Sequence, residues 1–449
     1  MNEPNAPSRQ TAPADARSAA YRSLLRWERD RKYANLEIDA AIRSFGLEGR
    51  ERRFFTTLVY GVIERQITLD YYLDLLVSRP YGALEDGVRM LLRLGAYQIL
   101  YLDRVPDSAA VSTSVELAKR FLHRGTEGFV NGVLRNLIRR RDLLPLPADE
   151  EALLSVRYAC PAWLVRLWRT DYGNEKAEAL LAASLRHPGL TLRVNTLKTT
   201  RNGLIARLTE EGIPCRPTAL SPDGIRLDSP TTPSELTALT EGLCFIQDEA
   251  SQLCVSVLGA RPGETVLDLC ACPGGKSFGI AMSMEDRGRL FSFDLHESKL
   301  SLVRSGAERL GIGCLTASAR DGRDPDPAFF GAADRVLCDV PCSGLGVIAK
   351  KPDLRHKDPA EIAPLPEIQY RILSSGAVSV RPGGVLVYST CTLNRRENEA
   401  VADRFLAEHP DFSPSGEGMP FGRERITLFP DEGETDGFFI ARFRRTTNG

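Results

Sequence analysis

The sequence of 449 residues has no long hydrophobic run and no excess of charge of either sign. The apolar stretch 91–102 is interrupted by Arg93, and the run 384–388 is far shorter than the roughly 20 residues that a membrane-spanning helix needs. Lysine and arginine number 58 against 59 aspartate and glutamate, so the net charge of −1 does not by itself indicate a nucleic-acid partner. With 43% hydrophobic and 26% charged residues, wholesale disorder and a collagen-like fibre are excluded. We expect no membrane partner.

Histidine is scarce, and the cysteines lack the spacing of a metal site. There are five histidines, and the ten cysteines include no Cys-x-x-Cys pair, so no metal centre is expected. Residues 1–14 contain three prolines and no apolar core, which predicts a disordered tail and not a signal peptide. Without an export signal we expect reduced thiols and a cytoplasmic location. Nothing in the sequence demands more than a monomer.

Residues 15–144 are predicted to form an all-helical domain. Apolar residues recur at the helical spacing i, i+3, i+4, i+7 in the stretches 88–102, 111–122 and 129–137. Such stripes are typical of the core of a helix bundle. Asp107 and Ser108 follow a proline and are predicted to cap the start of a helix with their side chains.

Charge is distributed unevenly along the chain. Residues 1–144 hold 23 Lys/Arg and 18 Asp/Glu, a balance of +5, whereas the remaining 305 residues hold 35 and 41, a balance of −6. Arg135 and Arg139–Arg141 form a local basic cluster. A cluster of this kind is either a solvated helix face or part of an RNA-binding surface, and the sequence leaves both open.

The segment 145–245 is expected to be a small α/β insert after a proline-containing linker. It carries no motif of its own. Its patterns predict helices over 163–168, 175–185 and 201–211, and strands over 190–194 and 224–227.

Residues 246–449 are expected to form an α/β domain with a doubly wound, Rossmann-like parallel sheet. Short apolar runs bounded by Gly, Pro or Asp alternate with helical stretches, as such a sheet requires. These predicted strands cover 265–269, 290–293, 335–339 and 384–389, and a closing antiparallel hairpin is expected over 426–428 and 437–443.

The turn after the first of these strands is predicted to bind a nucleotide-type cofactor. Ligands of open α/β sheets bind beyond the carboxyl ends of the strands, and glycines there let the backbone approach a ligand closely. The turn has neither a G-x-G-x-x-G fingerprint nor the spacing of a P-loop, which argues against a dinucleotide-binding or an ATP-binding site. Asp294 closes the second strand and is placed to accept hydrogen bonds from a ribose diol. The turn itself consists of Cys270, Ala271, Cys272, Pro273, Gly274, Gly275 and Lys276.

Cys342 and Cys391 follow two predicted strands that should be central in the sheet. The C5 carbon of a pyrimidine is a poor nucleophile, but a thiolate that adds to C6 makes C5 enolate-like. After methylation, a base removes the C5 proton and the thiol is eliminated. Asp339 lies three residues before Cys342, where a carboxyl group would stabilise the adduct near N3 and the exocyclic amine. Cys338 should point to the opposite face of the strand and lie in the core.

These motifs closely resemble those of the Sun/Fmu family of RNA cytosine-C5 methyltransferases. The matching segments are 268–276 (Asp-Leu-Cys-Ala-Cys-Pro-Gly-Gly-Lys), 321–323 (Asp-Gly-Arg), 339–343 (Asp-Val-Pro-Cys-Ser), 389–392 (Ser-Thr-Cys-Thr) and 396–399 (Arg-Glu-Asn-Glu). Residues 88–137 are similar to the NusB-type RNA-binding domain that precedes the catalytic domain in the bacterial 16S ribosomal RNA methyltransferase B subgroup. In this sequence Cys272 stands where the family usually has Ala, which adds an oxidisable thiol near the cofactor.

The resemblance implies the fold of an S-adenosylmethionine-dependent methyltransferase that acts on small-subunit ribosomal RNA. It implies that the cofactor is held by Cys270–Lys276, by Asp294 at the ribose and by Asp321 near the adenine, with Asp339 at the same site. It also implies that Cys391 is the nucleophile and that Cys342 assists proton removal and product release. The spacing alone does not decide between the two thiols, since DNA cytosine methyltransferases use the Pro-Cys thiol.

Two alternatives stay open. The substrate could be a transfer RNA, against which only the NusB-like resemblance argues. The protein could also be a non-catalytic, RNA-binding ribosome assembly factor on the same fold, although Asp339 and both thiols are present. In either RNA the target base must leave its stack to reach a pocket.

Overall fold

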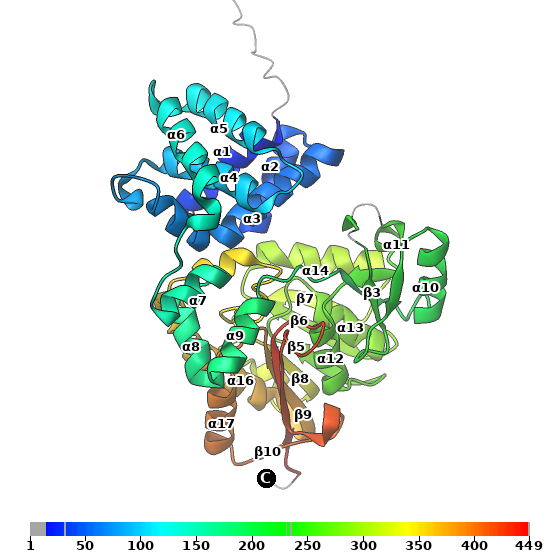
Figure 1. Ribbon diagram of the computed structural model, residues 1–449. Coiled ribbons are helices and arrows are strands. Elements are labelled where there is room, and N and C mark those ends of the chain that lie inside the picture. The colour runs from blue at the N-terminus through cyan, green and yellow to red at the C-terminus, as the bar shows by residue number, and fades with distance from the viewer. Residues whose placement is uncertain (1–14, 31–32, 230, 234–235, 448–449) are drawn as a thin grey trace, which may run out of the picture. The chain divides into compact units, whose positions relative to one another are not determined.

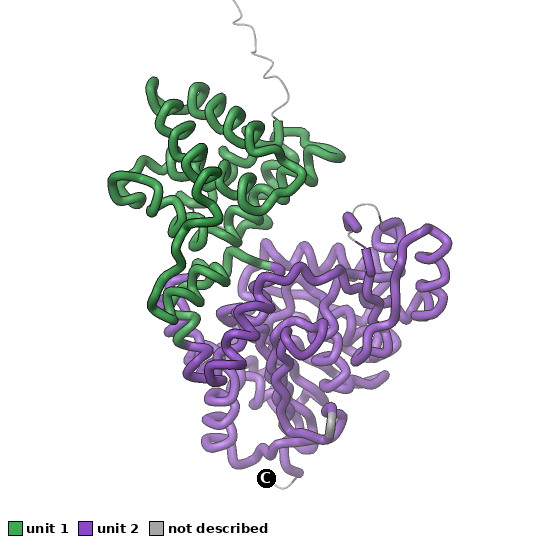
Figure 2. The backbone as a smooth tube through the Cα atoms, in the orientation of Figure 1, with its two compact units in different colours: residues 1–166, 351–356 green, residues 167–350, 357–449 purple. Residues whose placement is uncertain are grey.

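The computed structural model describes residues 15–30, 33–229, 231–233 and 236–447, so the tail expected over 1–14 lies outside the described residues. The chain divides into two units (Figure 2). The first comprises residues 1–166 and 351–356, and the second comprises 167–350 and 357–449. None of the described helices combines the length and the apolar character needed to cross a membrane.

The first unit is all-helical, as the sequence predicts. Its helices bury a single apolar core that draws on every one of the three predicted stripes. The α-helices are α1 (Ala16–Asp30), α2 (Ala34–Phe45), α3 (Gly49–Asp74), α4 (Asp86–Tyr101), α5 (Asp107–Phe121), α6 (Thr126–Arg140) and α7 (Glu150–Tyr158). Short 3-10 turns are η1 (Tyr81–Ala83), η2 (Arg141–Leu143) and η5 (Pro352–His356), and α8 (Ala162–Tyr172) begins in this unit and ends in the second.

Arg93, which interrupts the apolar stretch of α4, is buried with its charge paired. Its guanidinium donates to both carboxylate oxygens of Asp70, each at 2.7 Å, and to Glu28 at 3.2 Å. Because a buried charge is tolerated when it is paired and hydrogen-bonded, the arginine does not break the helix stripe.

The start of α5 differs from the prediction. The helix begins at Asp107, but its N-cap is Pro106 and no side chain accepts a capping hydrogen bond, so the predicted cap by Asp107 and Ser108 is wrong. Asp107 lies inside the first turn, where a carboxylate favours the positive end of the helix dipole, and it pairs with Arg141 at 3.3 Å. Of the basic cluster, Arg135, Arg139 and Arg140 are exposed along α6.

The η5 segment belongs to the first unit although it lies far along the chain, between the strands of the second. The Arg355 side chain is fully buried, and its guanidinium donates to the carbonyls of Glu64 and Ala159, both at 3.1 Å. A ring nitrogen of His356 lies 2.8 Å from the carbonyl of Ile63. The end of α7 and the middle of α3 are thereby joined through η5.

The second unit contains two sheets (Figure 1). The smaller is antiparallel, with strand order β2-β3-β1-β4, and it has its own core cluster. Its strands are β1 (Thr191–Val194), β2 (Cys215–Pro217), β3 (Gly224–Leu227) and β4 (Cys244–Ile246), accompanied by α9 (Asn174–Ala183), α10 (Arg201–Glu210) and α11 (Thr237–Thr240). The expected strands at 190–194 and 224–227 are present, whereas β2 and β4 were not predicted from the sequence.

The larger sheet has eight strands in the order β10-β12-β9-β8-β5-β6-β7, with β11 paired to β12. β5 to β9 pair in parallel, and the remaining strands pair antiparallel, which confirms the closing hairpin. The strands are β5 (Thr265–Asp268), β6 (Arg289–Asp294), β7 (Leu315–Ala319), β8 (Ala333–Asp339), β9 (Val380–Thr390), β10 (Phe412–Pro414), β11 (Arg425–Leu428) and β12 (Phe438–Arg445).

Helices cover both faces of this sheet. Alternate residues along β9 face opposite layers, as a strand period of two requires: Val385 and Val387 join one core cluster, and Leu386 and Tyr388 the other. Cys338 is buried in the second cluster, as predicted. One cluster contains α12 (Glu249–Leu258), α13 (Gly275–Ser283) and α14 (Glu297–Leu310), and the other contains α16 (Leu365–Ser379) and α17 (Glu399–Glu408). The remaining short elements are η4 (Pro327–Phe329), α15 (Pro359–Ile362) and η6 (Pro420–Gly422). The doubly wound, Rossmann-like fold is therefore confirmed.

Candidate active site

The carboxyl ends of β8 and β9 carry the two candidate thiols. These strands are neighbours near the middle of the sheet, as predicted. Cys342 follows β8 and Cys391 follows β9, and their Sγ atoms lie 3.3 Å apart. Both side chains are partly buried, and Cys391 packs against the core cluster that contains α12 and α13. The contact with Cys391, together with burial, holds the pKa of the Cys342 thiol well above its usual range.

Glu397 fixes the loop after β8 to the loop after β9. Its side chain is fully buried, and its two oxygens accept hydrogen bonds from the Ser343 amide at 2.8 Å and the Ser343 hydroxyl at 2.5 Å. The side-chain amides of Gln369 and Asn394 donate to the same carboxylate, both at 2.9 Å. A carboxylate with four donors stabilises one arrangement of these loops, because charge-assisted hydrogen bonds are the strong ones.

Further contacts hold the same two loops together. The Ser343 and Thr392 hydroxyls lie 2.6 Å apart, and the amide of Gly346 donates to the carbonyl of Cys391 at 3.0 Å. The Lys357 ammonium donates to the carbonyl of Ser343 at 2.9 Å. The spacing of the two thiols therefore depends on side chains outside the Pro-Cys and Thr-Cys motifs.

Asp339, at the end of β8, has both carboxylate oxygens engaged. Lys276 donates to Oδ2 at 2.7 Å and the Ser389 hydroxyl donates to Oδ1 at 2.8 Å. Burial alone would lower the pKa of Lys276, but the charge and hydrogen bond of Asp339, together with the nearby Cys254 and Cys391, outweigh it and the pKa is raised. Lys276, which the sequence assigned to the cofactor turn, thus forms an ion pair with Asp339, the candidate catalytic carboxylate.

The turn after β5 meets the end of β6. The amide of Cys272 donates to Asp294 Oδ2 at 3.3 Å, so two predicted cofactor residues lie together. Gly274 has a φ of 112°, and a Cβ atom there would lie 2.3 Å from the ring of Phe278, so the turn needs glycine at this position. Asp268 at the base of the turn is fully buried and bonded to the Ser277 hydroxyl at 2.6 Å. Burial raises the pKa of Asp268 to about 7.

Two other predicted residues have distinct surroundings. Burial, followed by the charge of Asp294, raises the pKa of the Cys272 thiol to about 12, so this extra thiol stays protonated at neutral pH. Asp321 follows β7 and is bonded to Arg323 at 2.9 Å, which lowers the pKa of the carboxyl to about 2. Within the described residues, no hydrogen bond or ion pair joins Asp321 directly to the other candidates, although a Cβ atom on its neighbour Gly322 would lie 3.2 Å from the carbonyl oxygen of Leu269.

Sequence reasoning missed Glu397 as a separate site residue. It noted Glu397 only within the Arg-Glu-Asn-Glu motif, and it gave no role to Gln369, Ser389 or Lys357. The available signal was a glutamate and two asparagines directly after a thiol-bearing strand. Such residues are equally common in solvated loops, so burial was needed to single out Glu397.

Comparison with known proteins identifies the family. Residues 255–444 match the 16S rRNA methyltransferase RsmB/F family, residues 14–139 match the NusB family, and residues 160–233 match the ferredoxin-like domain of RsmF/B-like methyltransferases. A probable ribosomal RNA small subunit methyltransferase B of Bacillus subtilis (strain 168) is 40% identical over 442 residues, covering 96% of this chain and 98% of the relative. The chain belongs to the 16S rRNA methyltransferase RsmB/F family.

Two further similarities agree with this RsmB/F assignment. The ribosomal RNA small subunit methyltransferase B of Salmonella arizonae is 34% identical over 398 residues, covering 88% of this chain and 90% of the relative. The crystal structure of PH0851 superposes with a TM-score of 0.83 at 26% identity, over 97% of this chain and 100% of that one. The family resemblance inferred from the motifs is thus confirmed, together with the NusB-type domain.

Proposed function

We propose that this RsmB/F family member transfers a methyl group from S-adenosylmethionine to C5 of a cytosine in 16S ribosomal RNA, through a covalent bond between Cys391 and C6. The observation that carries the proposal is the 3.3 Å separation of the Cys342 and Cys391 sulfurs beside a fixed carboxylate, Asp339. The names of the relatives, which are small-subunit ribosomal RNA methyltransferases, support the choice of RNA.

The residues beyond β5, β6 and β7 fit S-adenosylmethionine. Asp294 lies partly exposed beside the glycine turn, where a ribose diol can donate to it. Asp321 stays ionised because of Arg323 and would accept from the adenine amine. Lys276 is engaged with Asp339, so the turn does not direct this cation at a pyrophosphate. Residues Cys270–Lys276, Asp294 and Asp321 would hold the cofactor, which supplies an electrophilic methyl group when bound.

Cys391 is the proposed nucleophile. Its thiolate adds to C6 of the cytosine, the C5–C6 double bond opens, and C5 becomes the carbon that accepts the methyl group. The raised pKa of Cys342 supports this order of roles, because a thiol that keeps its proton is not the resting nucleophile. Once Cys391 is bonded to C6, it no longer raises the pKa of Cys342 as a thiolate neighbour, so Cys342 can release its proton to water.

Asp339 and Cys342 complete the proposed cycle. The Asp339 carboxylate would accept a hydrogen bond from the exocyclic amine beside N3 of the cytosine, and the Lys276 ammonium bonded to it would offset the negative charge that develops in the adduct. Lys276 and Ser389 hold both of its oxygens, so it needs little rearrangement during the reaction. Cys342, now a thiolate, removes the C5 proton. The C5–C6 double bond re-forms and the bond between C6 and Cys391 breaks, which returns Cys391 as the thiolate and Cys342 as the thiol.

The proposal is tested by incubating the protein with labelled S-adenosylmethionine and unmodified 16S RNA, either free or in partly assembled small subunits. We expect label at C5 of a cytosine, no product from Cys391→Ser, and a covalent RNA adduct on denaturing gels from Cys342→Ala. Cys215→Ala, which alters a partly exposed thiol in β2, is the matched control and should behave as the wild type.

The rival functions predict different results. Methylation of unmodified transfer RNA but of neither ribosomal substrate would replace the RNA in the proposal. Binding of 16S RNA without any methyl transfer would favour a non-catalytic assembly factor. Normal turnover by Cys342→Ala would show that the role given to this thiol is wrong.

A further inference from the structure

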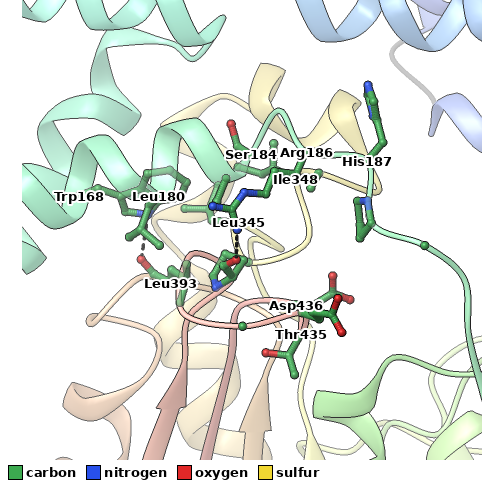
Figure 3. A pocket seen from close by; sticks show the side chains of 18 of the residues that line it. Trp168, Leu180, Ser184, Arg186, His187, Leu345, Ile348, Leu393, Thr435 and Asp436 are labelled. Carbon is green, nitrogen blue, oxygen red and sulfur yellow. Dashed lines mark hydrogen bonds between the residues drawn. The ribbon is translucent and has the colours of Figure 1, made fainter. Parts of the chain in front are cut away.

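The second unit has a cavity of about 260 Å³ next to the thiol-bearing loops (Figure 3). Its walls come from α8, α9, the segment before β1, strand β3, the loops after β8 and β9, and the loop before β12. The volume lies just below that of typical ligand pockets, which is about 300–1,000 Å³. A cavity of this size suits one planar group and not an oligonucleotide.

The cavity shares its wall with both thiol-bearing loops. Leu345 and Gly346 line it and follow Cys342 in the chain, and Leu393 lines it and follows Cys391. The amide of Gly346 donates to the carbonyl of Cys391 at 3.0 Å. The carbonyl of Leu393 accepts from the indole nitrogen of the buried Trp168 at 3.1 Å, as Figure 3 shows. A group bound in the cavity would therefore lie beside the loops that hold the two thiols.

Four charged residues of the lining are already engaged. Arg186 donates to the carbonyl of Pro430 at 3.1 Å, and Arg226 donates to the carbonyl of Glu434 at 2.8 Å. The carboxylates of Glu434 and Asp436 are paired with Arg216 at 2.7 Å and with Lys350 at 2.9 Å.

These pairings decide what kind of group fits. Because the lining holds two arginines and two carboxylates, it has no net positive charge to favour a phosphate. The partly exposed apolar part of the lining, which includes Pro188, Ala349 and Pro430, suits a flat neutral group, and Thr435 and the arginines offer hydrogen bonds to a polar edge. A nucleobase has this combination of an apolar face and a polar edge.

We propose that the cavity binds one unstacked base of the substrate RNA next to the target cytosine. The inference rests on the proposed function, which makes a single strand of RNA the chain nearest to the two thiols. When the target base leaves its stack, its neighbour loses a stacking partner, and unstacking a base costs free energy. Seating the neighbour in the cavity compensates for this loss and fixes the position of the target base.

The test fills the cavity and removes the bases that could occupy it. Ala349, a partly buried residue of the lining, is replaced by leucine. The matched control is Ala332→Leu, which adds the same side chain at an exposed position before β8. Both variants and the wild type are given short RNAs that contain the methylated cytosine, each with one neighbouring nucleotide made abasic in turn.

We expect one abasic position to lower kcat/KM of the wild type by about tenfold, since stacking a base on a protein surface contributes about 1–3 kcal/mol. Ala349→Leu should show a similar loss on intact RNA and no further loss with that abasic RNA, while its KM for S-adenosylmethionine is unchanged. Fluorescence anisotropy of the same RNAs without methyl donor should show the same non-additivity in affinity. The control should match the wild type throughout.

Three results would overturn the proposal. The first is that Ala349→Leu matches the wild type on every RNA. The second is that the abasic and Ala349→Leu losses multiply, which means that the base and the cavity do not interact. The third is that no single abasic position affects the wild type, as expected if the cavity takes a free small molecule. Failure of the wild type to methylate intact RNA would instead reject the proposed function, and with it this one.

Discussion

The sulfur atoms of Cys342 and Cys391 lie 3.3 Å apart, although the two residues are 49 positions apart in the sequence. Parallel pairing of β8 and β9 brings the ends of the two strands together. The backbone alone does not fix the two sulfurs, since each thiol lies on a loop beyond its strand. The buried carboxylate of Glu397, which accepts from residues on both loops, supplies the missing constraint.

Glu397→Gln is expected to lower kcat by roughly 10²-fold, because a displacement of about 1 Å at a reacting group has effects of this size. The glutamine amide replaces one acceptor by a donor, which then faces the donating groups of Ser343, Gln369 or Asn394. The measurement is single-turnover methylation with quantification of the RNA adduct. A positioning role would be contradicted if the variant has a lower melting temperature but converts the same fraction of the RNA adduct to product as the wild type. Glu399→Gln, the same change two residues along in α17, is the control.

The free energy of unfolding of Asp268→Asn should increase relative to that of the wild type as the pH rises. The native pKa of Asp268 is raised to about 7, so between the unfolded pKa and about 7 the native state binds the proton more tightly. The contribution of this group to stability is therefore present at low pH and is lost as the pH rises toward 7. Asparagine has no proton to lose. Urea unfolding measures the free energy of unfolding of the wild type and the variant at pH 5 and at pH 8. From pH 5 to pH 8, the wild type should lose about 2 kcal/mol more than the variant. An equal difference between the two proteins at both pH values would contradict the prediction.

Cys272→Ala should leave methylation within about twofold of the wild type. Its thiol has a pKa of about 12 because of burial and the nearby Asp294, so little thiolate exists at neutral pH. Iodoacetamide at pH 8 followed by peptide mass spectrometry should therefore modify Cys272 more slowly than an unperturbed thiol of a model peptide. Modification at the rate of the model peptide would show that the extra thiol is reactive.

Arg355→Ala should destabilise the protein by about 3 kcal/mol or more. The substitution removes a donor from the carbonyls of Glu64 in α3 and of Ala159 after α7, and it opens a space among them. Chemical unfolding with a probe in the helical unit, such as Trp27 fluorescence, measures the change. Arg104→Ala, at an exposed position, should stay within about 0.5 kcal/mol of the wild type.

Much of the fold could be predicted because it depends on local patterns. The apolar stripe of α4 and the apolar runs of β5, β6, β8 and β9 can each be recognised from a few consecutive residues. The strands β2 and β4 are three residues long, and so short a run has no period to read. The helix start at α5 was located from Pro106, but the capping side chain was wrong because an Asp beside a proline fits the first turn as well as the cap.

The candidate site also has a part that local motifs predict and a part that depends on tertiary packing. The positions of Cys342, Cys391 and Asp339 beyond their strands follow from the motifs. The pairing of Lys276 with Asp339 and the burial of Glu397 do not, because they join residues that are distant in the sequence and depend on how the loops pack. The roles of the individual residues stay predictions until the variants are measured.

The placement of η5 in the helical unit has a consequence for how the protein can be divided. The chain passes between the two units three times, after residues 166, 350 and 356. A fragment cut at the first passage would contain the helices but lack Arg355, the donor to the carbonyls of Glu64 and Ala159. Excision of the NusB-type part as one continuous piece would therefore leave it incomplete. We expect its folding to be thermodynamically coupled to the chain that also carries Cys342, so the two units should not melt as independent bodies.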